Sequence, residues 1–198
     1  MAEIIRCAWS EGNDLLRAYH DAEWGVPVHD DRTMYEHLFL EAMQCGLNWN
    51  MMLVKREVFR RCFADFDFEK IARFGEDDVR RIMEMPGMIK SRPKVCAEIN
   101  NAQRFMEVAA EYGSFCDYLW AHTGGKTLVY ASHEGQAVAQ NALSQAIAKD
   151  LKKRGFKYLG PVTLYSHLQA CGIINDHDRS CFRFAELMEQ HPAVWLDE

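Results

Sequence analysis

The sequence lacks the features that would place it in a membrane or outside the cell. Its 198 residues contain no apolar run long enough to cross a bilayer. The opening stretch, MAEIIRCAWSEGND, has no basic segment followed by a long apolar core, so no signal peptide is predicted. Internal repeats and low-complexity segments are also missing. We therefore expect an intracellular protein with no membrane partner, folded as a single domain over residues 1–198.

The cysteine content and the net charge argue against a disulfide-rich protein and against a generally basic nucleic-acid binder. The seven cysteines are an odd number and are scattered, which favours free thiols or metal ligands over a disulfide framework. A net charge of -6 argues against a generally basic nucleic-acid binder. Each basic cluster by itself is more often a solvated helix surface, but together the clusters would make a local phosphate-binding face. The clusters are Lys55, Arg56, Arg60 and Arg61; Lys90, Arg92 and Lys94; and Lys152, Lys153, Arg154 and Lys157.

Helical periodicity is abundant by contrast. Thr33-x-x-Glu36 has the pattern of a capping box, and apolar residues at helical spacing follow it as far as Met43. Asp67 is suited to cap a short helix, and Pro93 is suited to the first turn of another. The segment 124–135 is the least helical, with a short strand expected at 127–130. The sequence therefore predicts an all-α fold.

Four residues near the two ends of the chain have metal-ligand spacing. They are Cys7-x12-His20 and His177-x3-Cys181. Two sulfurs and two imidazoles make a closed tetrahedral shell that suits Zn²⁺, and a closed shell is structural rather than catalytic. Such a clasp would form a zinc lobe from residues 1–30 and 160–185. Spacing alone also allows the alternative that these are ordinary buried thiols and unrelated histidines.

A carboxylate and several aromatic residues are candidates for a ligand pocket. Glu41 lies at the edge of the apolar face of its predicted helix, where it is either solvated or directed into a pocket as an acceptor or base. Trp9, Tyr19, Trp24 and Trp49 could wall such a pocket, although each is more often a core residue.

Residues 79–110 contain a third candidate. A helix, the turn Met85-Pro86-Gly87 and a second helix opening at Pro93 resemble a helix-hairpin-helix, in which backbone N–H groups bind a DNA phosphate. Lys90, Arg92 and Lys94 would strengthen this contact. The motif usually has a second glycine near Ile89, and this chain does not.

Several longer motifs occur in a fixed order. They are CAW, AYHDAEWGVP at 18–27, LEAMQCGLNW at 40–49, KRE at 55–57, and LKKRGFKYLGPVTLYSHLQACGIINDH at 151–177 with the cysteine that follows. In these the chain resembles a 3-methyladenine DNA glycosylase of the constitutive, zinc-containing type, from Cys7 to Cys181. The resemblance implies a helix-hairpin-helix glycosylase fold and zinc held by Cys7, His20, His177 and Cys181. It implies a base pocket of Glu41, Trp9, Tyr19 and Trp49.

The resemblance also implies a function. The expected enzyme is a monomeric, bacterial-type cytoplasmic protein that flips alkylated bases out of double-stranded DNA and hydrolyses the N-glycosidic bond of 3-methyladenine. Residues Gln44 to Leu47 are candidates to enter the gap left by the flipped base. No lysine is clearly placed as a Schiff-base nucleophile, so a monofunctional enzyme is expected.

Two other classes of function stay open at this point. Asn48 and Asn50 flank Trp49 where family members usually have a serine before the tryptophan, and Met51-Met52 and the tail 182–198 also look unusual. These departures leave room for a non-catalytic, zinc-stabilised binder of distorted DNA. A zinc hydrolase of small molecules is the second alternative, and it would need only three protein ligands and an open position.

Overall fold

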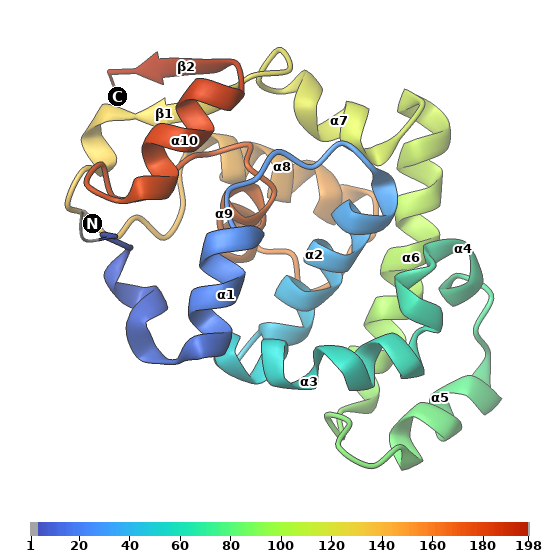
Figure 1. Cartoon of the computed structure of the whole chain (residues 1–198). Helices are drawn as coiled ribbons and strands as arrows, with labels where there is room; N and C mark the ends of the chain where they lie inside the picture. Colours follow the sequence, from blue (N-terminus) through green and yellow to red (C-terminus); the bar gives the residue numbers. More distant parts are fainter. Residues whose placement is uncertain (1–3, 198) are drawn as a thin grey trace.

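Helix α2 (Asp31–Gln44) is the centre of the molecule in the computed structural model, which describes residues 4–197. Every residue from Met34 to Met43 is buried, so the helix is covered on all sides. Helices α3, α6, α7 and α9 provide that cover (Figure 1). Residues 1–3 and 198, the ends of the predicted domain and zinc lobe, lie outside the described residues.

The described part of the chain is mostly helical. No helix within residues 4–197 combines the length and apolar character needed to span a membrane. Besides α2, the α-helices are α1 (Asp14–Ala22), α3 (Trp49–Cys62), α4 (Phe68–Ile71), α5 (Glu76–Glu84), α6 (Arg92–Tyr112), α7 (Phe115–Ala121), α8 (Ala142–Lys153), α9 (Pro161–Ala170) and α10 (Phe182–Gln190). Short 3-10 turns are η1 (Ala8–Gly12), η2 (Ala64–Phe66) and η3 (Ala131–His133).

Helix starts follow local capping chemistry, with one correction. The capping box expected at Thr33 and Glu36 is wrong, because α2 begins earlier, with the Asp30 carboxylate accepting a hydrogen bond from Thr33 N at 2.9 Å. Asp67 does cap α4, accepting from Lys70 N at 3.1 Å. Pro93 lies in the first turn of α6, as expected.

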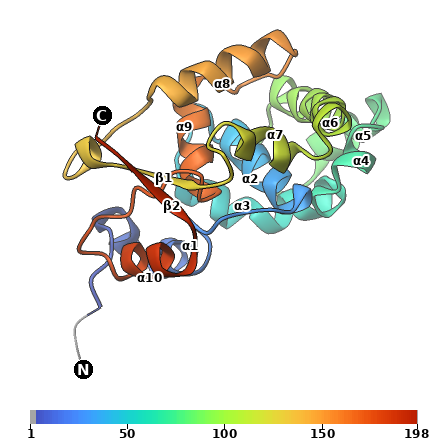
Figure 2. The same cartoon turned by 90° about the horizontal axis from the view of Figure 1, so that it is seen from above.

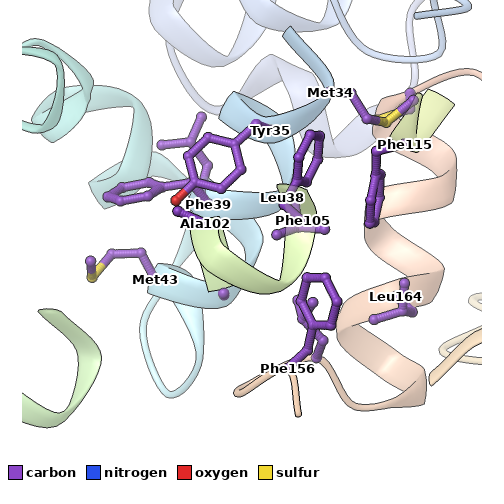
Figure 3. Packing of buried hydrophobic residues seen from close by; sticks show 14 of the residues in the cluster. Met34, Tyr35, Leu38, Phe39, Met43, Ala102, Phe105, Phe115, Phe156 and Leu164 are labelled. Atoms are coloured by element: carbon purple, nitrogen blue, oxygen red, sulfur yellow. The ribbon is translucent and has the colours of Figure 1, made fainter. Parts of the chain in front are cut away.

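Aromatic rings fill the space around α2. The Tyr35 ring meets Phe105 of α6 edge to face, with ring centroids 5.3 Å apart, and Phe105 stacks on Phe115 at 4.2 Å. Figure 3 shows these rings together with Leu38, Phe39 and other core residues. Because such pairs bury large areas and prefer tilted or offset contacts, they fix the distances at which α6 and α7 pack on α2.

A small sheet corrects the all-α expectation. Strand β1 (Thr127–Tyr130) occurs where a short strand was predicted, and it pairs in parallel with β2 (Ala193–Leu196) in the tail. On its other side β1 exchanges hydrogen bonds with the segment after α9, Leu128 N donating to Ile173 O at 2.8 Å and Asn175 N donating to Leu128 O at 2.9 Å. The tail and this segment together pair the N–H and C=O groups that a single strand would leave open. The local sequence around 193–196 gave no signal of this pairing.

The two ends of the chain meet. Figures 1 and 2 show α10 beside α1 and the N-terminal segment, and Phe182 N donates to Ile5 O at 3.0 Å. The segment after α1 also packs on the end of α9, where Val28 N donates to Cys171 O at 3.1 Å. The N- and C-terminal segments therefore form one lobe against the helical body.

Gly172 has no room for a side chain. Its φ is +71°, and a Cβ added there would lie 2.5 Å from Pro27 N and 2.6 Å from Gly25 O. We predict that Gly172→Ala lowers the free energy of unfolding by at least about 2 kcal/mol, since it adds both strain and a clash with rigid backbone. Urea denaturation measures this change.

Gly124→Ala is the matched control. Its φ is +62°, but no atom lies within 4 Å of an added Cβ, so only strain of about 1 kcal/mol is expected. Equal losses in the two variants would contradict the role assigned to the close approach at Gly172.

Candidate active site and metal centre

A cavity of about 800 Å³ opens between the N-terminal lobe and the helical body. Trp9, Tyr19, Glu41 and Trp49 all line it, and Gln44 lies at the end of α2 in the same wall. Trp9 comes from η1, Tyr19 from α1 and Trp49 from α3, and Glu41 comes from α2 like Gln44. The structure therefore brings together the residues that the sequence predicted for a base pocket. The volume suits a small planar ligand with space for polar contacts.

Glu41 is the buried acid of this cavity. Its side chain projects from the fully covered part of α2, and the residue is only 5% exposed. Burial raises the pKa of Glu41 to about 8, because an ionised carboxylate loses hydration there. A cation entering the cavity would offset that loss, so the site favours a positively charged ligand.

Tyr19 and Trp49 form the aromatic wall beside Glu41. Their ring centroids are 5.1 Å apart with the planes tilted by 51°. Tyr19 Oη and Trp49 Nε1 are both buried, and neither has a hydrogen-bond partner among the described residues. Burial raises the pKa of Tyr19, and the nearby Glu41 carboxylate raises it further, so the hydroxyl stays protonated. Two unpaired donors beside a buried acid are expected of a site that hydrogen-bonds a ligand.

Asn48 and Asn50 have structural roles next to this wall. The Asn48 side chain caps α3 by accepting from Met51 N at 2.9 Å, and Asn50 Oδ1 accepts from Asn13 Nδ2 at 2.9 Å. Asn13 in turn caps α1 by accepting from Leu16 N at 3.0 Å. Asn48 thus fixes the start of α3, and Asn50 ties it to the start of α1.

An aromatic chain connects the cavity to the predicted metal ligands. Trp9 contacts Trp24 with ring centroids 5.0 Å apart, and Trp24 contacts the His177 ring at 4.4 Å. Trp9 also meets His20 edge to face at 5.4 Å. The positions of the cavity aromatics therefore depend on the residues of the metal cluster.

Cys7, His20, His177 and Cys181 form a buried cluster that could hold a metal ion. Their ligand atoms all lie within 4.8 Å of one another. Cys181 Sγ lies 3.5 Å from His20 Nε2 and 3.6 Å from His177 Nδ1, which is also 3.6 Å from Cys7 Sγ. A tetrahedral ion with bonds of about 2.3 Å to sulfur and 2.0–2.1 Å to nitrogen separates its ligand atoms by roughly 3.3–3.8 Å. The four side chains fit such an ion.

A second set of contacts orients these ligands. The other ring nitrogen of His20, Nδ1, lies 2.8 Å from Asp21 Oδ1, and Arg6 holds that carboxylate from the far side at 2.8–3.0 Å. The Arg6 hydrogen bond keeps the pKa of Asp21 below its ordinary value. His177 Nε2 lies 3.1 Å from Trp24 O. Carboxylate and carbonyl partners of this kind fix the ring orientation of metal-binding histidines.

The helix pair α5–α6 contains the predicted DNA-binding hairpin. Gly87 lies in its turn with φ +80°, and its carbonyl accepts from Lys55 Nζ at 2.6 Å. Lys90 Nζ donates to Met85 O at 2.7 Å, and Arg92 pairs with Glu76 at 2.7 Å. The basic side chains of this turn therefore bind partners within the protein as well as giving it positive charge.

Lys94 connects this helix pair to the end of α2. Its Nζ donates to Met43 O and Cys45 O, each at 2.6 Å, and so satisfies carbonyls that the helix end leaves open. Leu47 follows in the same loop with 37% of its surface exposed. Gln44 and Leu47, predicted to fill the gap in DNA, thus lie at the junction of the cavity and the hairpin.

The sequence interpretation missed a polar cluster in the opposite wall of the cavity. The Asp176 carboxylate accepts from Gln169 Nε2 at 2.8 Å, lies 3.0 Å from His133 Nδ1, and accepts a hydrogen bond from Tyr165 Oη. Asp176 stands beside the metal ligand His177 in the motif GIINDH, which was the available signal. His133 had none, because it reaches the cavity only through the fold.

Comparison with known proteins decides the family. The model of the methyladenine glycosylase family matches residues 9–184. The chain belongs to the methyladenine glycosylase family. DNA-3-methyladenine glycosylase 1 of Escherichia coli (strain K12) is 40% identical over 177 residues, which are 89% of this chain and 95% of that protein. DNA-3-methyladenine glycosylase of Haemophilus influenzae is 34% identical, over 89% of this chain and 96% of that protein.

Solved methyladenine glycosylases share the fold. A crystal structure of 3-methyladenine DNA glycosylase I has a TM-score of 0.83 at 40% identity and covers 90% of this chain and 98% of that one. The enzyme from Staphylococcus aureus, solved to explain recognition of 3-methyladenine, has a TM-score of 0.85 at 33% identity, covering 91% and 97%. These relatives confirm the expected DNA repair glycosylase and disfavour the non-catalytic DNA binder.

The buried acid of this methyladenine glycosylase has a consequence for stability. The folded-state pKa of Glu41, about 8, lies above the ordinary value of 4.5. As pH rises between these values, the unfolded chain loses this proton and the folded protein keeps it, so stability falls. We predict that Glu41→Gln does not lose stability in this way. The free energy of unfolding of the variant, relative to that of the wild type, should therefore increase with pH, to an upper bound of about 5 kcal/mol near pH 8.

Urea denaturation at several pH values tests this difference. Glu57→Gln on α3 is the control, because the Glu57 side chain is 80% exposed. Its difference from the wild type should not change with pH. A pH-independent difference for Glu41→Gln as well would show that burial does not hold the proton on Glu41.

Proposed function

We propose that this chain removes 3-methyladenine from alkylated double-stranded DNA by hydrolysing the N-glycosidic bond. The observation that carries the proposal is the buried acid Glu41 in a cavity walled by Tyr19, Trp49 and Trp9. Methylation at N3 makes the adenine base cationic while it is still attached to the sugar. A desolvated carboxylate among aromatic faces binds a flat cation better than it binds a neutral base.

Recognition requires the nucleotide to leave the duplex. Methylation weakens stacking, so the cost of flipping is lower for the damaged nucleotide. In the cavity, the base stacks against Tyr19 and Trp49, and the Glu41 carboxylate accepts hydrogen bonds from its exocyclic amine or a protonated ring nitrogen. The unpaired Tyr19 Oη and Trp49 Nε1 supply further donors. Unmodified adenine has no positive charge to offset the burial of Glu41, and this is the basis of selectivity.

Bond cleavage needs little acid catalysis. The bond electrons pass to the base, which leaves as neutral 3-methyladenine. Water adds to the sugar carbon and releases one proton to the solvent, which gives an abasic site. Glu41 stabilises the positive charge near the reacting bond. None of the described residues that line the cavity is a lysine. A Schiff base to the sugar therefore has no nucleophile there, and the enzyme is monofunctional.

The metal and the hairpin complete the proposal. Cys7, His20, His177 and Cys181 would hold one Zn²⁺ in a closed structural site. This site would join the two segments of the zinc lobe, 1–30 and 160–185, within a single glycosylase domain of residues 1–198. Four protein ligands leave no open position, which disfavours the zinc hydrolase alternative. Residues 79–110 act as a helix-hairpin-helix, with Gly87, Lys90, Arg92 and Lys94 at a DNA phosphate. Gln44 and Leu47 enter the gap left by the flipped nucleotide.

Glu41→Gln tests the function directly. Release of 3-methyladenine from methylated duplex DNA, measured by chromatography of free bases, should fall about 100-fold or more, because the variant cannot carry the negative charge. The kcat/KM of the wild type should rise towards pH 8 as Glu41 ionises, and that of the variant should not. Wild-type excision by a folded Glu41→Gln protein would remove Glu41 from the mechanism.

Metal content tests the clasp. Elemental analysis should find about one zinc per chain, and Cys181→Ser should lose both zinc and stability because a closed shell loses a thiolate. Cys62→Ser is the matched control, since Cys62 is equally buried but far from the cluster in sequence and structure. It should retain one zinc. Fully active, folded protein without metal would contradict the assignment.

A further inference from the structure

Tyr158 combines an unusual backbone conformation with an exposed aromatic ring. Its φ is +58°, in the left-handed region that residues with bulky side chains rarely adopt. The residue is 41% exposed, so burial of the ring compensates only in part for that conformation. A strained backbone that presents a ring to solvent is a feature of functional surfaces.

The surrounding contacts hold Tyr158 beside the end of α2. Its carbonyl accepts a hydrogen bond from Cys45 Sγ at 3.4 Å. The preceding residue, Lys157, is held on both sides by Asn101 of α6, which accepts from Lys157 N at 2.8 Å and donates to Lys157 O at 3.1 Å. The backbone of this loop is therefore fixed between α2 and α6.

This position lies between the two proposed DNA contacts. On one side, Tyr158 shares a surface pocket of about 400 Å³ with Pro93 in the first turn of α6, the second helix of the hairpin. On the other side, the Cys45 loop continues to Leu47, which is 37% exposed. Gln44, which precedes Cys45, lines the cavity that contains Glu41. Tyr158 thus lies between the first turn of α6 and the Cys45 loop, and that loop joins it to the cavity wall at Gln44.

The surface around Tyr158 and the Cys45 loop is apolar, and it has positive charge next to it. Besides Leu47 and Tyr158, Val162 at the start of α9 is 53% exposed, and its neighbour Thr163 lies 3.6 Å from Cys45 Sγ. Lys157 is exposed next to Tyr158. Apolar side chains flanked by a cation match a DNA duplex opened at one base pair, where base faces are uncovered and phosphates are close.

We propose that Tyr158 is a second wedge residue, which enters the duplex beside Leu47 and stacks on the base that flipping leaves without a partner. This inference rests on the proposed glycosylase function and adds a positioning residue to it. An aromatic ring replaces the stacking that the orphaned base loses, so it lowers the cost of holding the damaged nucleotide in the cavity. The Cys45 and Asn101 contacts hold the backbone of this loop in place, and the residue is 41% exposed there.

Tyr158→Asn removes the ring without forcing the backbone, since asparagine tolerates the left-handed region. Its kcat/KM for release of 3-methyladenine from methylated duplex DNA should fall at least 10-fold. Its Kd for free 3-methyladenine, followed by tryptophan fluorescence, should stay within 2-fold of the wild type, because the base pocket is intact. Its Kd for undamaged duplex should stay within 3-fold. Tyr158→Phe retains the ring and should keep at least half of wild-type excision.

Tyr112→Ala is the matched control. Tyr112 is 42% exposed at the far end of α6, roughly 30 Å along that helix from Pro93, and its loss should leave all three measurements unchanged. The proposal is overturned by wild-type duplex excision in Tyr158→Asn, by a parallel loss of free-base affinity, or by an equal loss in Tyr112→Ala. Absence of base release and base binding by the wild-type protein would instead refute the proposed function itself.

Discussion

The burial of α2 on every side is the constraint on which the rest of the structure depends. A helix with no solvent-facing stripe needs neighbours all around it, and α3, α6, α7 and α9 meet that need. Burial also places Glu41 where an ionised carboxylate is poorly solvated, which raises its pKa to about 8. The same packing that forms the core thus prepares the acid of the cavity.

The lobe formed by the N- and C-terminal segments supplies the cavity walls that face Glu41. Glu41 alone would be a destabilising group in a core. The Cys and His cluster holds the first and last segments of the chain together, and the contacts from Trp24 to His177 and from Trp9 to His20 and Trp24 extend from that cluster to the cavity. The N-terminal segment needs these contacts with the C-terminal segment, because η1 and α1 are short and bury few apolar residues of their own.

The lysines around the α5–α6 turn both satisfy backbone carbonyls and carry positive charge. Lys55, Lys90 and Lys94 all donate to main-chain carbonyls around the turn and the end of α2. These bonds satisfy groups that helix ends leave open, and they hold the α2 loop, the hairpin turn and α6 in one arrangement. In a chain with net charge -6, cations fixed in place concentrate positive potential at this turn.

The sequence by itself determined the mostly helical class, the cap at Asp67 and the helix start at Pro93. It also determined which cysteines and histidines to expect in one cluster and which side chains to expect around the cavity. Those features depend on local periodicity or on motifs that keep several functional residues in one short segment. Only the tertiary structure decided that β2 pairs with β1, that His133 joins Asp176 in the cavity wall, and that Tyr158 lies beside the Cys45 loop. Each of these joins segments far apart in sequence, and no periodic pattern records such a contact. The protonation of Glu41 belongs to the same group, because its pKa depends on burial by helices other than its own.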